Sequence, residues 1–267
     1  FTASQRFPLK SLDDRAAGYR LVSEQIRRAQ QYANFCATLS KRLSYVDRQY
    51  STGREAFNSL AEEFYSARKP DEQAFFRQAS LIGAADKRTW SEIFQNSEPT
   101  HLIIELGDGQ FPLIRRLENG QYELHSFFRD FLREKLNAVE GEDVIFRLHA
   151  RFAERYEALG DLREAIHHRV EAQDWSNAIR LLTAASEHLL NEAPLLIKTI
   201  LDKFPPEQLL ADLRLVNLRA SALIQLGDMA GAYRSYRDVL TQKTSGALAV
   251  DGIAGYRRMA ETLAQRN

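Results

Sequence analysis

The sequence has one cysteine, no excess charge of either sign and no long apolar segment. Because Cys36 stands alone, an internal disulfide and a multi-cysteine zinc site are excluded, and a reducing, cytoplasmic compartment is expected. Lys plus Arg and Asp plus Glu both total 36, so no global basic field favours direct contact with nucleic acid. No run of 18 apolar residues occurs, so we expect no membrane-spanning helix.

Known catalytic signatures are also missing. The chain has no Gly-Lys pair and therefore no P-loop, and it has no G-x-S-x-G, H-E-x-x-H or C-x-x-C motif. The paired acids Glu62-Glu63 and Asp71-Glu72 are neighbours on expected helices, so they do not converge as acid–base catalysis requires. Gly107-Asp108-Gly109 predicts only a turn. We therefore expect no catalytic residues and no enzyme activity from this chain alone.

No metal site is predicted either. Glu164 and His168 are four residues apart on an expected helix and could face one ion, but a solvated helix surface explains them better. Adjacent His167 and His168 point about 100° apart on a helix, which is unfavourable for sharing one metal. Cys36 is interpreted as a small buried residue, and the short basic pairs Arg27-Arg28 and Arg257-Arg258 as solvated faces.

Helical periodicity dominates what is present, and the predicted fold class is mainly α. Residues 1–52 predict a helical segment, which is interpreted either as the tail of an ATPase module or as its linking helices, and Ser51-Thr52-Gly53 predicts a break after it. Residues 53–138 predict three short helices, a small β-hairpin and an amphipathic helix, which together describe a winged-helix-like domain. Residues 139–267 predict tetratricopeptide-like helical repeats forming an α-solenoid.

The hairpin prediction depends on Asn119-Gly120 between two alternating segments. A two-residue type I′ turn needs positive φ at both positions, which Asn and Gly tolerate best. That loop would place Leu117 opposite Tyr122 and Arg116 opposite Glu123, the latter as a cross-strand charge pair.

A recurring Asp-x3-Ala signature supports the repeat prediction. It starts at Asp161, Asp174 and Asp228, and the first and third are preceded by Leu-Gly, 67 residues apart, close to two 34-residue repeats. We expect each Asp to cap a helix N-terminus, and each Ala to lie where the paired helix approaches closely.

His125 is the one residue for which a binding function is weighed. It ends the second predicted strand and opens the following helix, so its backbone direction should be fixed. The turn itself could satisfy its side chain, or the imidazole could donate to a phosphate oxygen.

LHSFFRDFL (Leu124–Leu132) resembles the region after the wing hairpin in signal-transducing ATPases with numerous domains. It is most similar to the large ATP-binding transcription regulators of the LuxR type. The segments Leu60–Ile82 and Arg147–Leu182 resemble the preceding helix and the start of the superhelical sensor, and the resemblance covers roughly 55–190.

The resemblance implies a regulatory portion of a bacterial cytoplasmic switch. An upstream domain would hold ADP or ATP with Mg²⁺, and the winged-helix domain would lock ADP in the resting state, with His125 contacting the β-phosphate. Related ATPases commonly carry an acid after this histidine, where this chain has Ser126. A small-molecule inducer or regulatory protein would bind the superhelix, on the concave face of residues 143–267, and activation would involve self-association. The alternative is a helical-repeat adaptor without nucleotide dependence.

Overall fold

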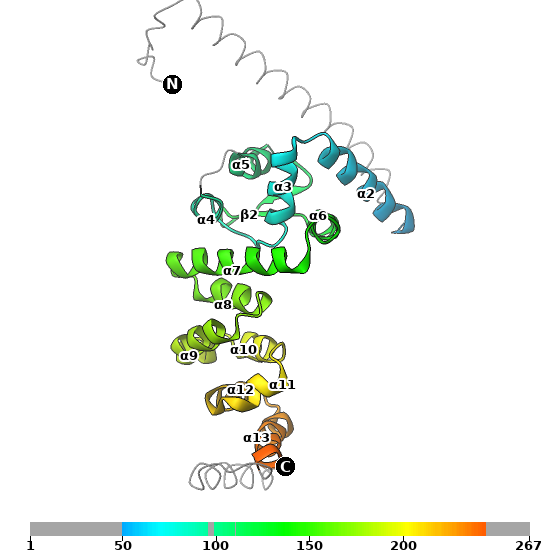
Figure 1. Ribbon diagram of the computed structural model, residues 1–267. Coiled ribbons are helices and arrows are strands. Elements are labelled where there is room, and N and C mark those ends of the chain that lie inside the picture. The colour runs from blue at the N-terminus through cyan, green and yellow to red at the C-terminus, as the bar shows by residue number, and fades with distance from the viewer. Residues whose placement is uncertain (1–49, 96–98, 110, 244–267) are drawn as a thin grey trace, which may run out of the picture. The chain divides into compact units, whose positions relative to one another are not determined.

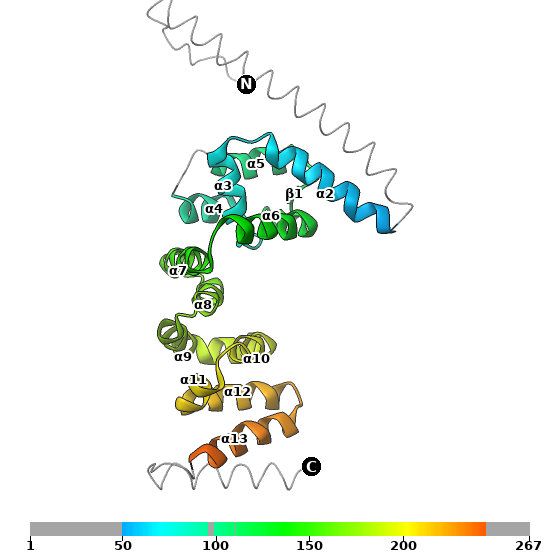
Figure 2. The same cartoon turned by 45° about the vertical axis from the view of Figure 1, so that its right-hand side comes forward.

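The computed structural model describes residues 50–243 apart from 96–98 and 110. Over these residues the chain is mainly α-helical, as the sequence predicts, with twelve helices and one two-stranded sheet (Figures 1 and 2). The chain divides into two compact units, N-terminal and C-terminal, between Leu136 and Asn137. In the described part, no helix combines the length and apolar character needed to cross a membrane.

The N-terminal unit consists of helices around a small hairpin (Figure 1). Its elements are α2 (Tyr50–Ser66), α3 (Pro70–Ala79), α4 (Lys87–Ile93), α5 (Thr100–Asp108), β1 (Ile114–Arg116), β2 (Tyr122–Leu124) and α6 (Ser126–Val139). Two turns expected from the sequence are absorbed into helices. Helix α2 runs through Ser51–Gly53, because one glycine costs a helix only about 1 kcal/mol. Gly107 and Asp108 are the last residues of α5.

Aromatic side chains hold the N-terminal unit together. The ring of Phe64 on α2 lies 5.4 Å from that of Phe76 on α3 and 5.7 Å from that of Phe128 on α6, so one residue joins three helices. Trp90 on α4 is fully buried, and its indole N–H donates to the Tyr122 carbonyl of β2 over 3.3 Å. The hairpin is therefore fixed to the helical core, and the residues after β2 begin from a rigid position.

The hairpin exists, but its predicted register is wrong by one residue. Arg115, not Arg116, is opposite Glu123, and the two form an ion pair at 2.6 Å. The loop contains three residues, because Leu117 N–H donates to the Gln121 carbonyl, and Gly120 N–H donates back to Leu117. Only Gly120 has a positive φ, at 81°, so the turn is not type I′. A three-residue loop that ends on a left-handed glycine gives this register.

The C-terminal unit is entirely helical over its described residues. After the last residues of α6, its helices are α7 (Glu142–Leu159), α8 (Leu162–Glu171), α9 (Trp175–Glu192), α10 (Pro194–Leu201), α11 (Pro206–Ala211), α12 (Leu213–Gln225) and α13 (Met229–Lys243). Helices that follow one another pack together, as α7 with α8, α8 with α9, and α12 with α13, and α9 and α10 also contact α12. Pro206 begins α11, as expected from the missing backbone N–H of proline.

Three helix starts in this unit share the predicted Asp-x3-Ala geometry. The carboxylate of each Asp accepts a hydrogen bond from the backbone N–H three residues later, and each Ala is fully buried between paired helices. The caps are Asp161 at 3.2 Å, Asp174 at 3.3 Å and Asp228 at 2.7 Å, and the alanines are Ala165, Ala178 and Ala232. The local prediction is confirmed: these positions are a cap and a close-packing residue.

The residue before each capping Asp has a left-handed backbone. Gly160 and Gly227 have φ of 80° and 81°, and Gln173 takes the same place with φ of 56°. In all three turns the N–H of the Asp reaches back five residues to a carbonyl of the preceding helix, at 2.8–2.9 Å. This hydrogen bond is typical of the Schellman motif at helix C-termini, so the same turn geometry occurs three times in the unit.

Candidate functional site at the junction of β2 and α6

The backbone of His125 is held on both sides of the junction between β2 and α6. Its N–H donates to the Leu113 carbonyl over 2.8 Å, and its carbonyl accepts from Arg129 N–H at 2.9 Å as the first turn of α6 forms. Leu113 itself is fully buried. The direction of the His125 side chain is therefore set by the sheet and the helix together, as the sequence suggests.

The imidazole of His125 lies against two phenylalanine rings. The Phe57 ring of α2 and the Phe127 ring of α6 have centroids 5.5 and 5.6 Å from it, and Phe57 is buried while Phe127 is 47% exposed. Burial is the main cause that lowers the pKa of His125 below its usual 6.5, and the nearby Arg115 guanidinium adds to it, while Glu123 opposes it. The ring is therefore neutral at pH 7.

The two ring nitrogens of His125 have different surroundings. Nδ1 is buried and has no hydrogen-bond partner in the part of the chain that the structure describes. A buried N–H without an acceptor is less well tolerated than a buried lone pair, so the favoured tautomer carries its proton on Nε2. His125 consequently offers one N–H, at Nε2, to a ligand that has an acceptor oxygen.

Two arginines lie at this junction. Arg129 is one turn further along α6, and its Nη2 is 3.5 Å from the Leu124 carbonyl, so the guanidinium folds back toward the junction. Arg115 reaches from β1 and acts electrostatically on both His125 and Arg129. The junction thus combines an N–H donor with two cationic side chains, which suits an anionic group.

The predicted solvated surface around Glu164 and His168 is wrong for His168. Its side chain is fully buried, its Nδ1 is 2.8 Å from Nδ1 of His149 on α7, and the Tyr156 ring stacks on it at 5.3 Å. Helix α8 packs against both α7 and α9, so little of its surface remains for water. The spacing held a signal for this, because His168 lies one turn after the close-packing Ala165.

Glu164 is unsuited to metal binding for an electrostatic reason. Burial, and secondarily Asp161, raise the pKa of Glu164, which disfavours the carboxylate form that a cation would need. Within the described ranges, no group of three or more His, Cys, Asp or Glu side chains is arranged to hold a metal ion.

The paired acids have structural contacts. Glu62 is ion-paired with Lys135 at 2.7 Å, and Glu72 accepts from the Lys69 backbone N–H at 3.3 Å at the start of α3. Glu63 and Asp71 are exposed on α2 and α3. Cys36 and the basic pairs Arg27-Arg28 and Arg257-Arg258 fall outside the described residues.

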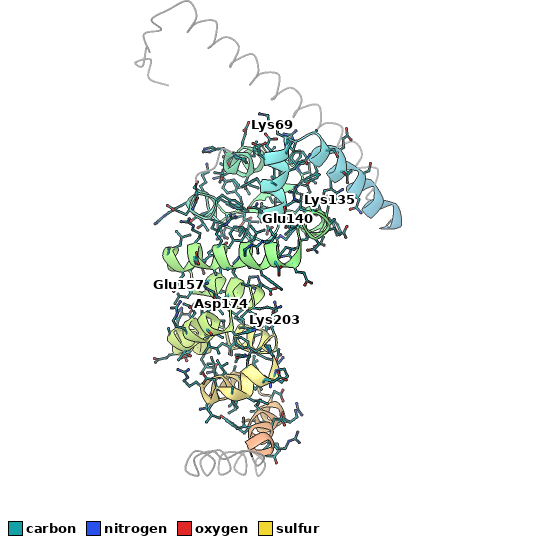
Figure 3. The ribbon with its side chains drawn as sticks, viewed as in Figure 1. Lys69, Lys135, Glu140, Glu157, Asp174 and Lys203 are labelled. Atoms are coloured by element: carbon teal, nitrogen blue, oxygen red, sulfur yellow. The ribbon has the colours of Figure 1, made fainter. Side chains whose placement is uncertain are left out.

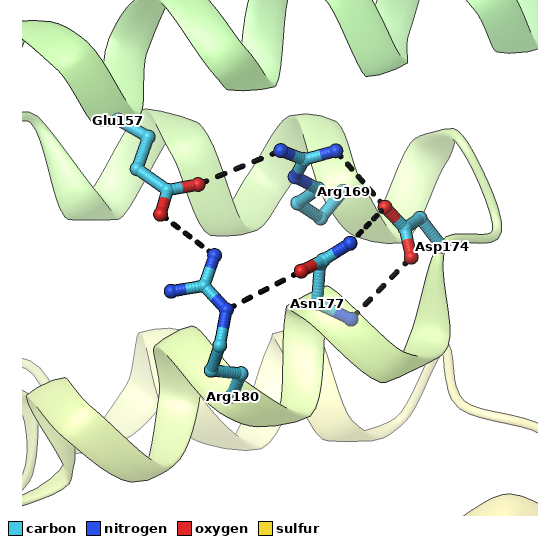
Figure 4. A network of polar contacts seen from close by, with 5 residues as sticks. All are labelled: Glu157, Arg169, Asp174, Asn177 and Arg180. Atoms are coloured by element: carbon cyan, nitrogen blue, oxygen red, sulfur yellow. Dashed lines mark hydrogen bonds and ion pairs between the residues drawn. The ribbon is translucent and has the colours of Figure 1, made fainter.

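A polar network that the sequence did not reveal joins α7, α8 and α9 (Figure 4). Arg169 has only 9% of its side chain exposed and is ion-paired with Asp174 at 2.9 Å and with Glu157 at 3.5 Å. Glu157 also binds Arg180 of α9 at 2.6 Å, and Asn177 bridges Asp174 and Arg180. Figure 3 shows Glu157 and Asp174 within the C-terminal unit, where they hold successive helices in place.

A cavity of about 480 Å³ lies in the C-terminal unit, lined by residues on and beside α10–α13. Its lining combines apolar side chains with polar ones, among them Arg219, whose Nε and Nη2 donate to the Asp202 carboxylate at 3.2 and 2.7 Å. Small-molecule sites are commonly of this size, with apolar walls and a few polar groups.

Comparison with known proteins finds no matching family model, no matching curated protein and no matching solved structure.

Proposed function

We propose that this chain is the regulatory portion of a ligand-responsive, ATP-dependent transcription regulator. The N-terminal unit would act as a winged-helix element that helps retain ADP in the resting state, and the C-terminal unit would act as a tetratricopeptide-like sensor. The observation that supports the proposal is the rigidly placed neutral His125, which offers an Nε2–H and lies near the Arg115 guanidinium. The nucleotide and its Mg²⁺ would be held mainly by an upstream domain.

In this proposal His125 has a positioning and binding role without chemistry of its own. Its Nε2–H would donate to a phosphate oxygen of ADP, and the apolar wall of Phe57 and Phe127 would strengthen that bond by excluding water. Loss of the bond would free the unit to move and the protein to self-associate.

The experiment is His125→Ala in the full-length protein, with bound ADP measured after purification. We expect ADP retention to fall about tenfold or more, because a hydrogen bond to a charged group contributes about 1.5–3 kcal/mol. His101→Ala is the control, since His101 is exposed on α5. Equal ADP content in the His125 variant and the wild type would refute the role of His125.

The cavity of the C-terminal unit is the proposed inducer site. An inducer that binds only the folded state must raise the melting temperature of the chain. Leu209→Trp would fill the cavity from a half-buried position, so it should remove that rise without unfolding the unit. A ligand whose thermal shift survives Leu209→Trp binds elsewhere.

A second candidate function is a helical-repeat adaptor for another protein. It is favoured by the exposed apolar side chains Leu195 and Leu226, which are 61% and 41% exposed on the C-terminal unit. This function predicts partner binding that is lost in Leu195→Asp and is indifferent to ADP or ATP.

A further inference from the structure

Arg129 is the least well compensated cation at the junction. Among the described residues its Nε is buried without a hydrogen-bond partner, and its side chain makes one hydrogen bond, the long one of 3.5 Å from Nη2 to the Leu124 carbonyl. Burial lowers the pKa of Arg129, and Arg133 lowers it further. A half-buried guanidinium with so few contacts costs stability, unless an anion supplies the missing partner.

The carboxylates nearby do not supply that partner directly. Glu123 and Asp130 favour the charged form of Arg129 only electrostatically. The Glu123 carboxylate is already bound by Arg115 at 2.6 Å, and Arg115 opposes the charge of Arg129. The terminal nitrogens of Arg129 therefore retain N–H groups that no described residue uses.

We propose that Arg129 is a second anion-binding residue, which together with His125 holds a phosphate-bearing ligand at the junction of β2 and α6. Arg129 follows His125 by four positions in the first turn after the junction, and its guanidinium folds back to the Leu124 carbonyl, next to His125 in the chain. A guanidinium fork matches phosphate oxygens geometrically, and Arg115 adds positive potential from β1. The inference rests on the proposed function only in identifying the phosphate as that of a bound nucleotide.

The test is a titration of the chain with inorganic pyrophosphate at constant ionic strength, followed by NMR of the His125 ring and by thermal unfolding. Arg129→Gln should weaken binding about tenfold or more, since a charge-assisted hydrogen bond is lost. Arg129→Lys keeps the charge but lacks the guanidinium fork, so its pyrophosphate affinity should lie between that of Arg129→Gln and that of the wild type.

Arg116→Gln is the matched control, because it removes the same charge at a position on β1 instead of α6. Arg116 is adjacent to Arg115 on β1 and so points to the opposite face, where it pairs with Asp108 at 3.3 Å. The Arg116→Gln substitution should change the pyrophosphate affinity less than about twofold, because salt screens an exposed charge on the opposite face of the hairpin. Unfolding of each variant without ligand shows that the fold is intact.

The outcomes separate this inference from the proposed function. Binding that requires His125 but is unchanged in Arg129→Gln would overturn the inference and leave the ADP role of His125 standing. Binding that requires Arg129 but not His125 would support the anion site and count against that role. Absence of any response to about 10 mM pyrophosphate, a concentration that detects millimolar affinity, would overturn the inference.

Discussion

Gly160 and Gln173 occupy the same left-handed position in two consecutive turns, one between α7 and α8 and the other between α8 and α9. A residue with a Cβ pays about 1–2 kcal/mol there, which glycine avoids. We expect Gln173→Gly to raise the free energy of unfolding of the C-terminal unit by about 0.5–1 kcal/mol after the entropy of the unfolded chain is counted. Gly160→Ala should lower it by about 1 kcal/mol. Urea unfolding of both variants checks the pair, and equal effects of the same sign would contradict the shared turn geometry.

The burial of His125 predicts a pH dependence. Its pKa in the folded protein is below 6.5, so the folded state binds fewer protons than the unfolded state as the pH falls through this range. The stability contributed by neutral His125 is present above about pH 6.5 and lost as the pH falls through the lowered pKa. Wild type should therefore lose more stability than His125→Phe between neutral and mildly acidic pH. Parallel stability curves for the two proteins would contradict this.

At the scale of elements, the network around Arg169 holds α7, α8 and α9 together. Arg169 is almost buried, so Arg169→Met leaves Glu157 and Asp174 without their shared cation and should destabilise the unit by about 2 kcal/mol. Arg180→Met removes another partner of Glu157, but Arg180 is 52% exposed, so a change within about 0.5 kcal/mol is expected. Denaturant unfolding compares them, and equal losses would show that burial does not govern this network.

The elements also show where sequence reasoning succeeds and where it stops. The Asp caps and buried alanines could be predicted because each depends on a local pattern that repeats. The hairpin register could not, because Asn-Gly suits both a two-residue and a three-residue loop, and packing of Tyr122 against α4 and α5 selects between them. The burial of His168 could not be predicted, because it comes from helices on both sides of α8, which the periodicity of one helix does not reveal.

For the candidate site, the sequence could place His125 at a strand-to-helix junction but could not supply its surroundings. Phe57 is 68 positions earlier in the chain, and its contact with the imidazole depends on how α2 packs. The contribution of Arg129 depends on a guanidinium that folds back along α6, which the residue type alone does not specify.

At the scale of the whole molecule, the two compact units predict two separable stabilities. The chain has two tryptophans, Trp90 in the N-terminal unit and Trp175 in the C-terminal unit, so each unit has its own fluorescent reporter. Phe64→Ala should lower the stability reported by Trp90 by about 3–5 kcal/mol, since Phe64 is buried among three helices. The Trp175 signal should not change. Single-tryptophan variants make the measurement, and equal shifts of both signals would contradict independent units.

Our proposal that this chain belongs to a nucleotide-controlled regulator can be tested on the reading frame that encodes it. We expect a G-x-x-x-x-G-K-[ST] motif that follows a strand upstream of this chain, and a helix-turn-helix downstream of it, in one reading frame. Sequencing of that frame is the measurement. A frame without a P-loop would contradict this proposal, because no bound nucleotide would then supply a phosphate for His125 to contact. The helical-repeat adaptor would be the better explanation.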